Sequence, residues 1–306
     1  MASETYKYDS VILEQDANIR SYDRSWKIGP HHSSVVANFR TRLAQVTVME
    51  TPDFGKVVLL DGEIQSSAAD QKFYHQALCR PALAACSDEV KRVLVLGGGE
   101  LCTIKEVLSW PGVESVDMVD YDQTFVEFAK RRLKDWHEDS YKDPRVKLHF
   151  ADAWSWTYQA RVIEEHYDSI IIDLTDLSLE AETVEMTHWT NLIENCLQLL
   201  RPGGSMSMYV GMYIPWKNET MMSAYLAVKQ ILLSNGRSEV VQPYKVFVPS
   251  FASGEAFFLR IAPEENLQKE LPIVTSNQWY FGQKEMNNAI SFGSDWIVPV
   301  TDPEMA

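Results

Sequence analysis

The sequence has few cysteines and no long apolar run. Its four cysteines form no CxxC pair, and its seven histidines show no metal-ligand spacing beyond one adjacent pair. This argues against a disulfide framework, and we expect buried free thiols and no metal. No stretch approaches the roughly 18 apolar residues of a membrane span, and the first ten residues, MASETYKYDS, do not read as a signal peptide. We therefore expect a cytoplasmic protein with no membrane partner.

Positive charge is also scarce. The chain of 306 residues has 28 Lys and Arg against 43 Asp and Glu, a formal net charge of −15. A nucleic-acid reader needs a basic face for the phosphates, so the composition argues against a nucleic-acid partner. A cationic ligand fits better, although many proteins are acidic for solubility alone. The net charge therefore supports a cationic ligand only if particular residues form a cation site.

Two patterns of apolar residues divide the chain. Residues 43–50 alternate between apolar and polar, and residues 56–60 follow a turn at 51–55, which predicts antiparallel strands. From Arg92 onward, short apolar runs alternate with amphipathic stretches, which is typical of parallel strands buried on both faces. The sequence thus predicts an α/β fold with a small N-terminal antiparallel β domain over 1–85, a Rossmann-like domain over 86–262 and a C-terminal extension over 263–306.

The expected elements of the Rossmann-like domain follow from these runs. We expect a turn after a helix at 201–204 and a closing antiparallel pair at 241–248 and 255–261. The remaining expected strands are 93–96, 115–119, 146–150, 169–172 and 205–210.

The first strand of this domain ends in three glycines, Gly97, Gly98 and Gly99, before a helical segment. Strand, glycines and helix in this order let a nucleoside approach the backbone at the carboxyl end of a parallel strand. Asp120 ends the next strand, where a carboxylate can accept hydrogen bonds from both hydroxyls of a ribose. Together these features predict a nucleoside site, either for NAD or for an S-adenosyl sulfonium ligand.

A third acidic position favours the sulfonium ligand. Asp152 follows the strand at 146–150, as expected of a class I methyltransferase-type sheet, where this carboxylate contacts the adenine amino group. NAD proteins have no regular counterpart there. Glu100, directly after the glycines, would repel a pyrophosphate but attract the ammonium of an amino-alkyl sulfonium.

Two more acids end the fourth strand of this domain. The run IIIDLTD places Asp173 and Asp176 at its carboxyl end, facing the same cleft. Asp176 could also cap a following helix. Carboxylates brought together raise one another's pKa, and a bound polycation relieves that cost.

These residues, in this order, resemble the polyamine aminopropyltransferases over roughly residues 40–262. Residues 60–65, LDGEIQ, resemble the family's LDGxxQ, and residues 70–75, DQKFYH, resemble its DExxYH. The segments GGGE, DYD, DA and DLTD that contain the acids above are similar to its nucleoside and catalytic motifs. Glu100 after the glycines, DLxD rather than DSSD, and PSFA at 249–252 resemble the thermospermine-synthase branch.

The resemblance implies an enzyme that transfers an aminopropyl group from decarboxylated S-adenosylmethionine to a polyamine, releasing methylthioadenosine, without a metal. It implies a homodimer and a small cationic substrate, with spermidine converted to thermospermine or spermine. The implied catalytic residues are Asp173, Asp176 and Tyr74. Residues assigned to the cofactor are Gln45, Gly97, Gly98, Gly99, Glu100, Asp120, Asp152 and Ala153. Residues assigned to the amine are Gln65, Tyr74, His75, Asp176, Tyr209 and Phe251.

The chain departs from the family pattern at three positions. The glycine after the acidic residue is Leu101, the proline after the second catalytic Asp is Leu177, and a glutamine on the strand after 201–204 is replaced by Tyr209. These changes touch both ligand pockets. They leave two alternatives open: an S-adenosylmethionine-dependent N-methyltransferase acting on a small amine, and a non-catalytic polyamine-binding homologue.

Overall fold

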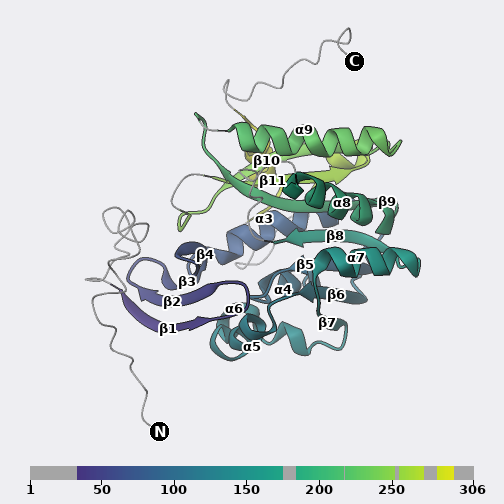
Figure 1. Ribbon diagram of the computed structural model, residues 1–306. Helices are drawn as coiled ribbons and strands as arrows, with labels where there is room; N and C mark the ends of the chain where they lie inside the picture. Colours follow the sequence, from purple (N-terminus) through teal and green to yellow (C-terminus); the bar gives the residue numbers. More distant parts are fainter. Residues whose placement is uncertain (1–32, 175–183, 217, 252–254, 272–280, 293–306) are drawn as a thin grey trace.

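The computed structural model describes residues 33–174, 184–216, 218–251, 255–271 and 281–292. They form two sheets, a four-stranded one and a seven-stranded one, with helices covering both faces of the larger sheet (Figure 1). None of the helices in the described part of the chain is long and apolar enough to cross a membrane.

The small sheet is an antiparallel meander in the order β1-β2-β3-β4. Asp61 and Gly62 connect β3 to β4, and both have positive φ, 49° and 89°, as a two-residue hairpin turn requires. The predicted N-terminal hairpin unit is confirmed. The strand bounds are β1 Ser34–Arg40, β2 Gln45–Thr51, β3 Gly55–Leu60 and β4 Glu63–Ser67.

The expectation of strands up to residue 85 is wrong for its last part, because helix α3 spans Gln71–Ala84. This helix packs on β8, β9 and β11 of the large sheet and is buried on nearly every side. Even its polar residues Gln71, His75, Gln76 and Arg80 are buried, so their spacing does not mark a solvent-exposed face. Pro81 lies inside α3 and has no N–H to donate to the Ala77 carbonyl; the Tyr244 hydroxyl donates to that oxygen instead, at 2.9 Å. The domain limits 1–85, 86–262 and 263–306 remain predictions.

The large sheet has the order β10-β11-β9-β8-β5-β6-β7, with β5 to β9 parallel and β10 and β11 antiparallel. This confirms the predicted Rossmann-like α/β class and the closing antiparallel pair. The bounds are β5 Arg92–Gly97, β6 Ser115–Asp120, β7 Val146–Phe150, β8 Tyr167–Asp173, β9 Leu200–Tyr213, β10 Val240–Phe247 and β11 Glu255–Ala262.

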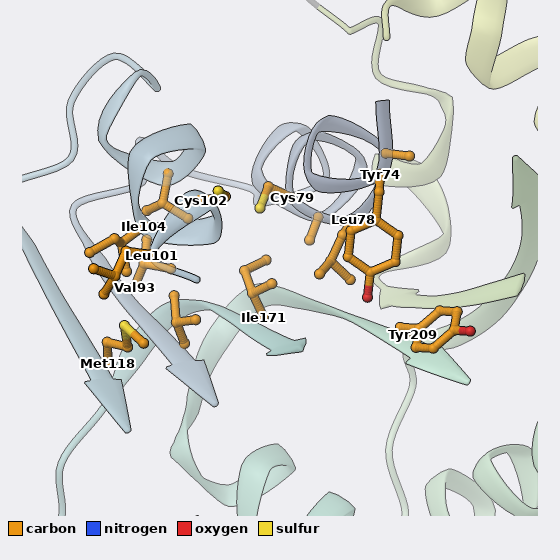
Figure 2. Packing of buried hydrophobic residues seen from close by; sticks show 14 of the residues in the cluster. Tyr74, Leu78, Cys79, Val93, Leu101, Cys102, Ile104, Met118, Ile171 and Tyr209 are labelled. Atoms are coloured by element: carbon orange, nitrogen blue, oxygen red, sulfur yellow. The ribbon is translucent and has the colours of Figure 1, made fainter. Parts of the chain in front are cut away.

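Successive residues of the central strands enter two different cores. Val93 and Val95 of β5 face α3 and α4, whereas Leu94 and Leu96 face α7, α8 and α9. Figure 2 shows the first core, in which Leu78 of α3 lies among residues of the sheet. Burial on both faces explains the continuous apolar runs in the sequence. The helices are α4 Cys102–Leu108, α5 Gln123–Arg132, α6 Lys134–His137, α7 Ala153–Val162, α8 Val184–Leu199, α9 Glu219–Ser234 and α10 Gln283–Ala289.

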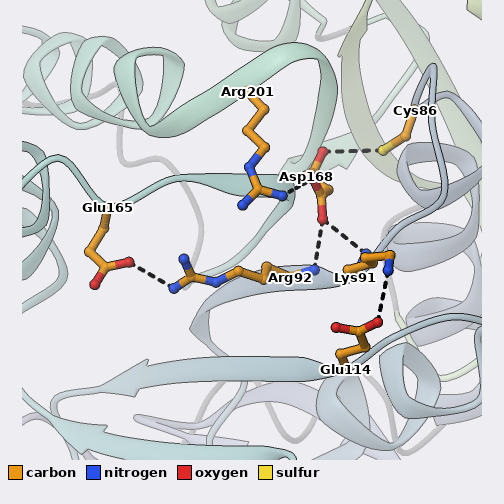
Figure 3. Close-up of polar contacts among 7 residues, drawn as sticks. All are labelled: Cys86, Lys91, Arg92, Glu114, Glu165, Asp168 and Arg201. Carbon is orange, nitrogen blue, oxygen red and sulfur yellow. Dashed lines mark hydrogen bonds and ion pairs between the residues drawn. The ribbon is translucent and has the colours of Figure 1, made fainter.

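The turn predicted at 201–204 belongs to strand β9, which begins at Leu200. These four residues oppose the single residue Asp168 of β8 and form a bulge in the ladder, with Gly203 at φ 79°. The Asp168 carboxylate accepts hydrogen bonds from the Lys91 and Arg92 backbone and from Arg201, at 2.8 to 2.9 Å (Figure 3). This carboxylate therefore joins the beginning of β5 to the bulge.

Candidate active site

The glycine run forms a tight connection between β5 and α4. Gly97 and Gly98 have φ of 82° and 78°, and the Gly98 N–H donates to the Asp173 carbonyl at 3.1 Å. A Cβ on Gly97 would lie 2.1 Å from that carbonyl oxygen. Glycine is therefore required here, because β5 and β8 end side by side and leave no room for a side chain.

Asp173 lies at the end of β8 with both carboxylate oxygens bound. The Tyr74 hydroxyl donates to Oδ1 at 2.9 Å, and the Thr103 hydroxyl donates to Oδ2. Tyr74 belongs to α3 and Thr103 to α4, so two helices fix the orientation of this carboxylate. Each oxygen retains a lone pair that can accept a proton or hold a cation.

Glu100 and His75 form a second polar pair beside Asp173. His75 Nε2 lies 3.9 Å from Glu100 Oε2, and both residues are buried. Burial and, to a smaller extent, the nearby Asp173 charge together raise the pKa of Glu100 to about 8. The Ser66 hydroxyl beside Glu100 opposes part of this rise, although it makes no hydrogen bond of normal geometry within the described residues. Glu100 is thus poised to lose its proton when a cation binds.

Aromatic side chains form one wall around the Tyr74 ring. Its centroid lies 5.5 Å from that of Tyr209, 5.8 Å from that of Phe251 and 5.5 Å from that of Phe258. The structure therefore brings together three residues singled out from separate segments of the sequence, Tyr74, Tyr209 and Phe251. Ring faces attract ammonium groups, which suits a cationic ligand.

Buried Asp70 connects this wall to the small sheet. It accepts hydrogen bonds from Ser67 and from the Ser250 backbone and hydroxyl, at 2.6 to 2.9 Å. The segment that carries Phe251 is thereby held to the beginning of α3.

The carboxylates expected to bind the nucleoside follow two neighbouring strands. Asp120 ends β6, and its Oδ1 accepts a hydrogen bond from the Asp122 N–H at 2.7 Å. Burial, with the charges of Asp122 and Asp173, raises the pKa of Asp120 to about 6. Asp152 caps α7 by accepting from the Ser155 N–H at 2.8 Å. Ala153 is the buried first residue of that helix.

Two predicted site residues make their described side-chain contacts away from this group. Gln45 and Gln65 make their described hydrogen bonds inside the small sheet, to Asn38 and Glu63 respectively. Asp176 lies outside the described residues, as does Leu177.

Sequence reasoning missed Thr103, and it did not predict the backbone conformation of Leu101. Threonine at the beginning of a helix gave no signal, because its partner Asp173 is 70 residues away. Leu101 adopts a left-handed conformation, φ 69°, with its side chain completely buried in the core shown in Figure 2. It retains the backbone conformation that glycine adopts easily, while its side chain anchors the loop.

The fold and these side chains together define the class of protein. A glycine loop and acids at the carboxyl ends of adjacent parallel strands are the arrangement of a nucleoside-binding Rossmann-like enzyme. The additional carboxylates and the aromatic wall suit a cationic second ligand.

Comparison with known proteins identifies the family. Residues 71–270 match the model of the spermine/spermidine synthase domain, and the chain belongs to this family. A polyamine aminopropyltransferase of Aeropyrum pernix is 34% identical over 226 residues, which cover 73% of this chain and 68% of the relative. Polyamine aminopropyltransferase 2 of Pseudomonas aeruginosa is 33% identical over 220 residues, 72% of this chain and 60% of the relative. The prediction of an aminopropyltransferase-type enzyme is confirmed at the level of the family.

Several relatives are matched over a smaller share of their length. The chain spans 62% of a polyamine aminopropyltransferase of Saccharolobus solfataricus at 35% identity. Solved structures agree on the fold: a spermidine synthase from Thermotoga maritima superposes with a TM-score of 0.70 at 19% identity, covering 85% of this chain and 84% of that one. A spermidine synthase in complex with the transition state analogue AdoDATO superposes with a TM-score of 0.69 at 22% sequence identity, covering 85% of each chain.

Proposed function

We propose that this protein transfers the aminopropyl group of decarboxylated S-adenosylmethionine to spermidine, giving thermospermine or spermine and methylthioadenosine. The observation that carries the proposal is Asp173, whose two oxygens are oriented by Tyr74 and Thr103 beside the glycine loop. In the reaction, a neutral amine nitrogen forms a bond to the propyl carbon, and the bond from that carbon to sulfur breaks. The electron pair leaves with the thioether, and the amine loses one proton.

Asp173 supports this displacement by accepting a hydrogen bond from the amine and helping it to lose its proton. A primary ammonium has a free pKa near that of lysine, about 10, so the acceptor needs help to become nucleophilic. The neighbouring sulfonium disfavours the ammonium form, while the carboxylate holds the nitrogen in line with the reacting carbon. Tyr74 is already bound to Asp173, and Asp176 completes the proposed catalytic group.

Glu100 selects the cofactor in this proposal. Decarboxylated S-adenosylmethionine and S-adenosylmethionine both carry an ammonium, but only the second carries a carboxylate. Two carboxylates about 4 Å apart repel by roughly 1 kcal/mol in water and about 4 kcal/mol at an effective dielectric of 20. The ammonium favours ionised Glu100, so binding of the decarboxylated cofactor releases the proton that burial retains on Glu100.

The other predicted roles complete the two pockets. Asp120 accepts from the ribose hydroxyls, and Asp152 accepts from the adenine amino group through the oxygen that does not cap α7. The remaining cofactor contacts are assigned to Gln45, Gly97, Gly98, Gly99 and Ala153. The polyamine lies against the aromatic wall, and its contacts are assigned to Gln65, Tyr74, His75, Asp176, Tyr209 and Phe251. On the sequence resemblance alone, we also propose a homodimer in the cytoplasm, which light scattering and cell fractionation test.

One assay tests the reaction. The full chain is incubated with putrescine, spermidine or spermine and with either form of the cofactor, and the products are separated by chromatography and mass. We expect an aminopropylated product from spermidine with the decarboxylated cofactor, and chromatography distinguishes the isomers thermospermine and spermine. A methylated amine would indicate the methyltransferase instead, and absence of any product would indicate a binding protein. Asp173→Asn is the matched inactive control.

A further inference from the structure

Three side chains of the types that can ligate a metal lie close together where α3 adjoins α4. One donor atom each of His75, Glu100 and Cys102 lies within 4.8 Å of the other two. His75 comes from α3, while Glu100 and Cys102 flank Leu101 at the beginning of α4, where Figure 2 shows Cys102. Within the described part of the chain, no other three His, Cys, Asp or Glu residues form such a group.

The histidine is oriented as in many metal sites. His75 Nδ1 lies 2.6 Å from the Gln71 carbonyl, which can only accept, so Nδ1 carries the hydrogen. In the neutral ring, Nε2 then presents its lone pair toward Glu100 Oε2, 3.9 Å away. Burial lowers the pKa of His75, which favours this neutral ring. A backbone carbonyl bound to the second ring nitrogen is the usual support of a metal-ligating histidine.

We propose that His75, Glu100 and Cys102 bind Zn²⁺ as an inhibitory ion. Nitrogen, carboxylate oxygen and thiolate sulfur bind this ion at roughly 2.0 to 2.3 Å. Burial raises the pKa of the Cys102 thiol, so its proton is released to water only as the ion binds. Tetrahedral ligands at those lengths lie roughly 3.3 to 3.8 Å apart. The donor atoms, which lie within 4.8 Å of one another, must therefore approach by about 1.5 Å at most. Water fills the fourth position, and the buried hydroxyl of Ser66 beside Glu100 offers it a hydrogen bond.

The ion inhibits the reaction because Glu100, once bound to zinc, can no longer bind the cofactor. This consequence rests on the proposed function, in which Glu100 holds the ammonium of the cofactor. Zn²⁺ and decarboxylated S-adenosylmethionine therefore exclude each other, so inhibition is competitive with the cofactor. Asp173 is outside the metal ligand set, and the displacement proposed above involves no metal.

Cobalt is the probe that tests the site without any catalytic assay. The metal-free full chain is titrated with Co²⁺, and the near-ultraviolet band of a thiolate bound to cobalt is recorded with the visible bands of a tetrahedral ion. We expect one equivalent to bind with both signals and Zn²⁺ to displace it. Cys102→Ser should remove the thiolate band, whereas Cys196→Ser should retain it. Cys196 is a matched control, because it is also buried but lies in the core on the other face of the sheet.

The outcomes separate this proposal from the proposed function. Changes in the outer partners of metal ligands alter affinity by about 10- to 100-fold, so loss of the thiolate ligand should weaken Zn²⁺ at least tenfold. Added decarboxylated S-adenosylmethionine should displace Co²⁺. A wild-type chain without a thiolate band, or a band that persists in Cys102→Ser, would overturn the metal site whatever the activity. A band that persists at saturating cofactor would retain the site but refute competition at Glu100, and the product assay without metal tests aminopropyl transfer separately.

Discussion

Glu100→Gln should stabilise the protein, and by more as the pH rises. The pKa of Glu100 is raised from 4.5 to about 8 in the folded protein by burial and by Asp173. Between these two values the unfolded chain has lost the proton that the folded chain retains, so the free energy of unfolding falls as pH rises. The free energy of unfolding falls by about 1.4 kcal/mol for each pH unit above 4.5, so the loss is roughly 3 kcal/mol at pH 7. Glutamine keeps the shape and has no proton to lose.

Urea denaturation of the unliganded chain at several pH values, from 4.5 to above the folded-state pKa of about 8, measures this difference. The difference in free energy of unfolding between Glu100→Gln and wild type should widen up to about pH 8 and then level off. Glu138→Gln is the control, because Lys105 lowers the pKa of that exposed carboxylate and its substitution should not reproduce the slope. If wild type and Glu100→Gln show parallel pH profiles, Glu100 is ionised in the folded protein and the reasoning about its burial is refuted.

Three further substitutions test the site. Asp173→Asn should abolish turnover while methylthioadenosine still binds, and equal loss of both would reassign Asp173 to the nucleoside. Asp120→Ala should weaken cofactor binding by roughly 1.5 to 3 kcal/mol, the worth of hydrogen bonds to a charged acceptor, and titration calorimetry measures it. An unchanged dissociation constant would remove Asp120 from the site. Thr103→Val should lower kcat about tenfold or more without changing the cofactor KM, because it frees one Asp173 oxygen. Thr103→Ser should restore the rate, and a variant that changes only KM would contradict this positioning role.

The parallel strands could be predicted because each is buried on both faces, and that burial demands a continuous run of apolar residues. The glycines at 97–99 and the acids at strand ends were visible for a similar reason. Backbone crowding at the end of β5 excludes a side chain at Gly97, and parallel strands deliver their terminal residues to one edge of the sheet. Local sequence thus determined the fold class and the placement of the glycines and acids at the strand ends.

Tertiary structure alone decided what surrounds those residues. Helix α3 is buried on nearly all sides, and only the packed chain shows that its polar residues, such as Gln76 and Arg80, lie inside the protein. The partners of Asp173 come from α3 and α4, and the ring contacts of Tyr74 reach β9 and the segment after β10. Hydrogen bonds between residues 70 to 100 positions apart leave no periodic trace in the sequence. The raised pKa of Glu100 arises in the same way, because it comes from burial and a neighbouring charge that only the packed chain supplies.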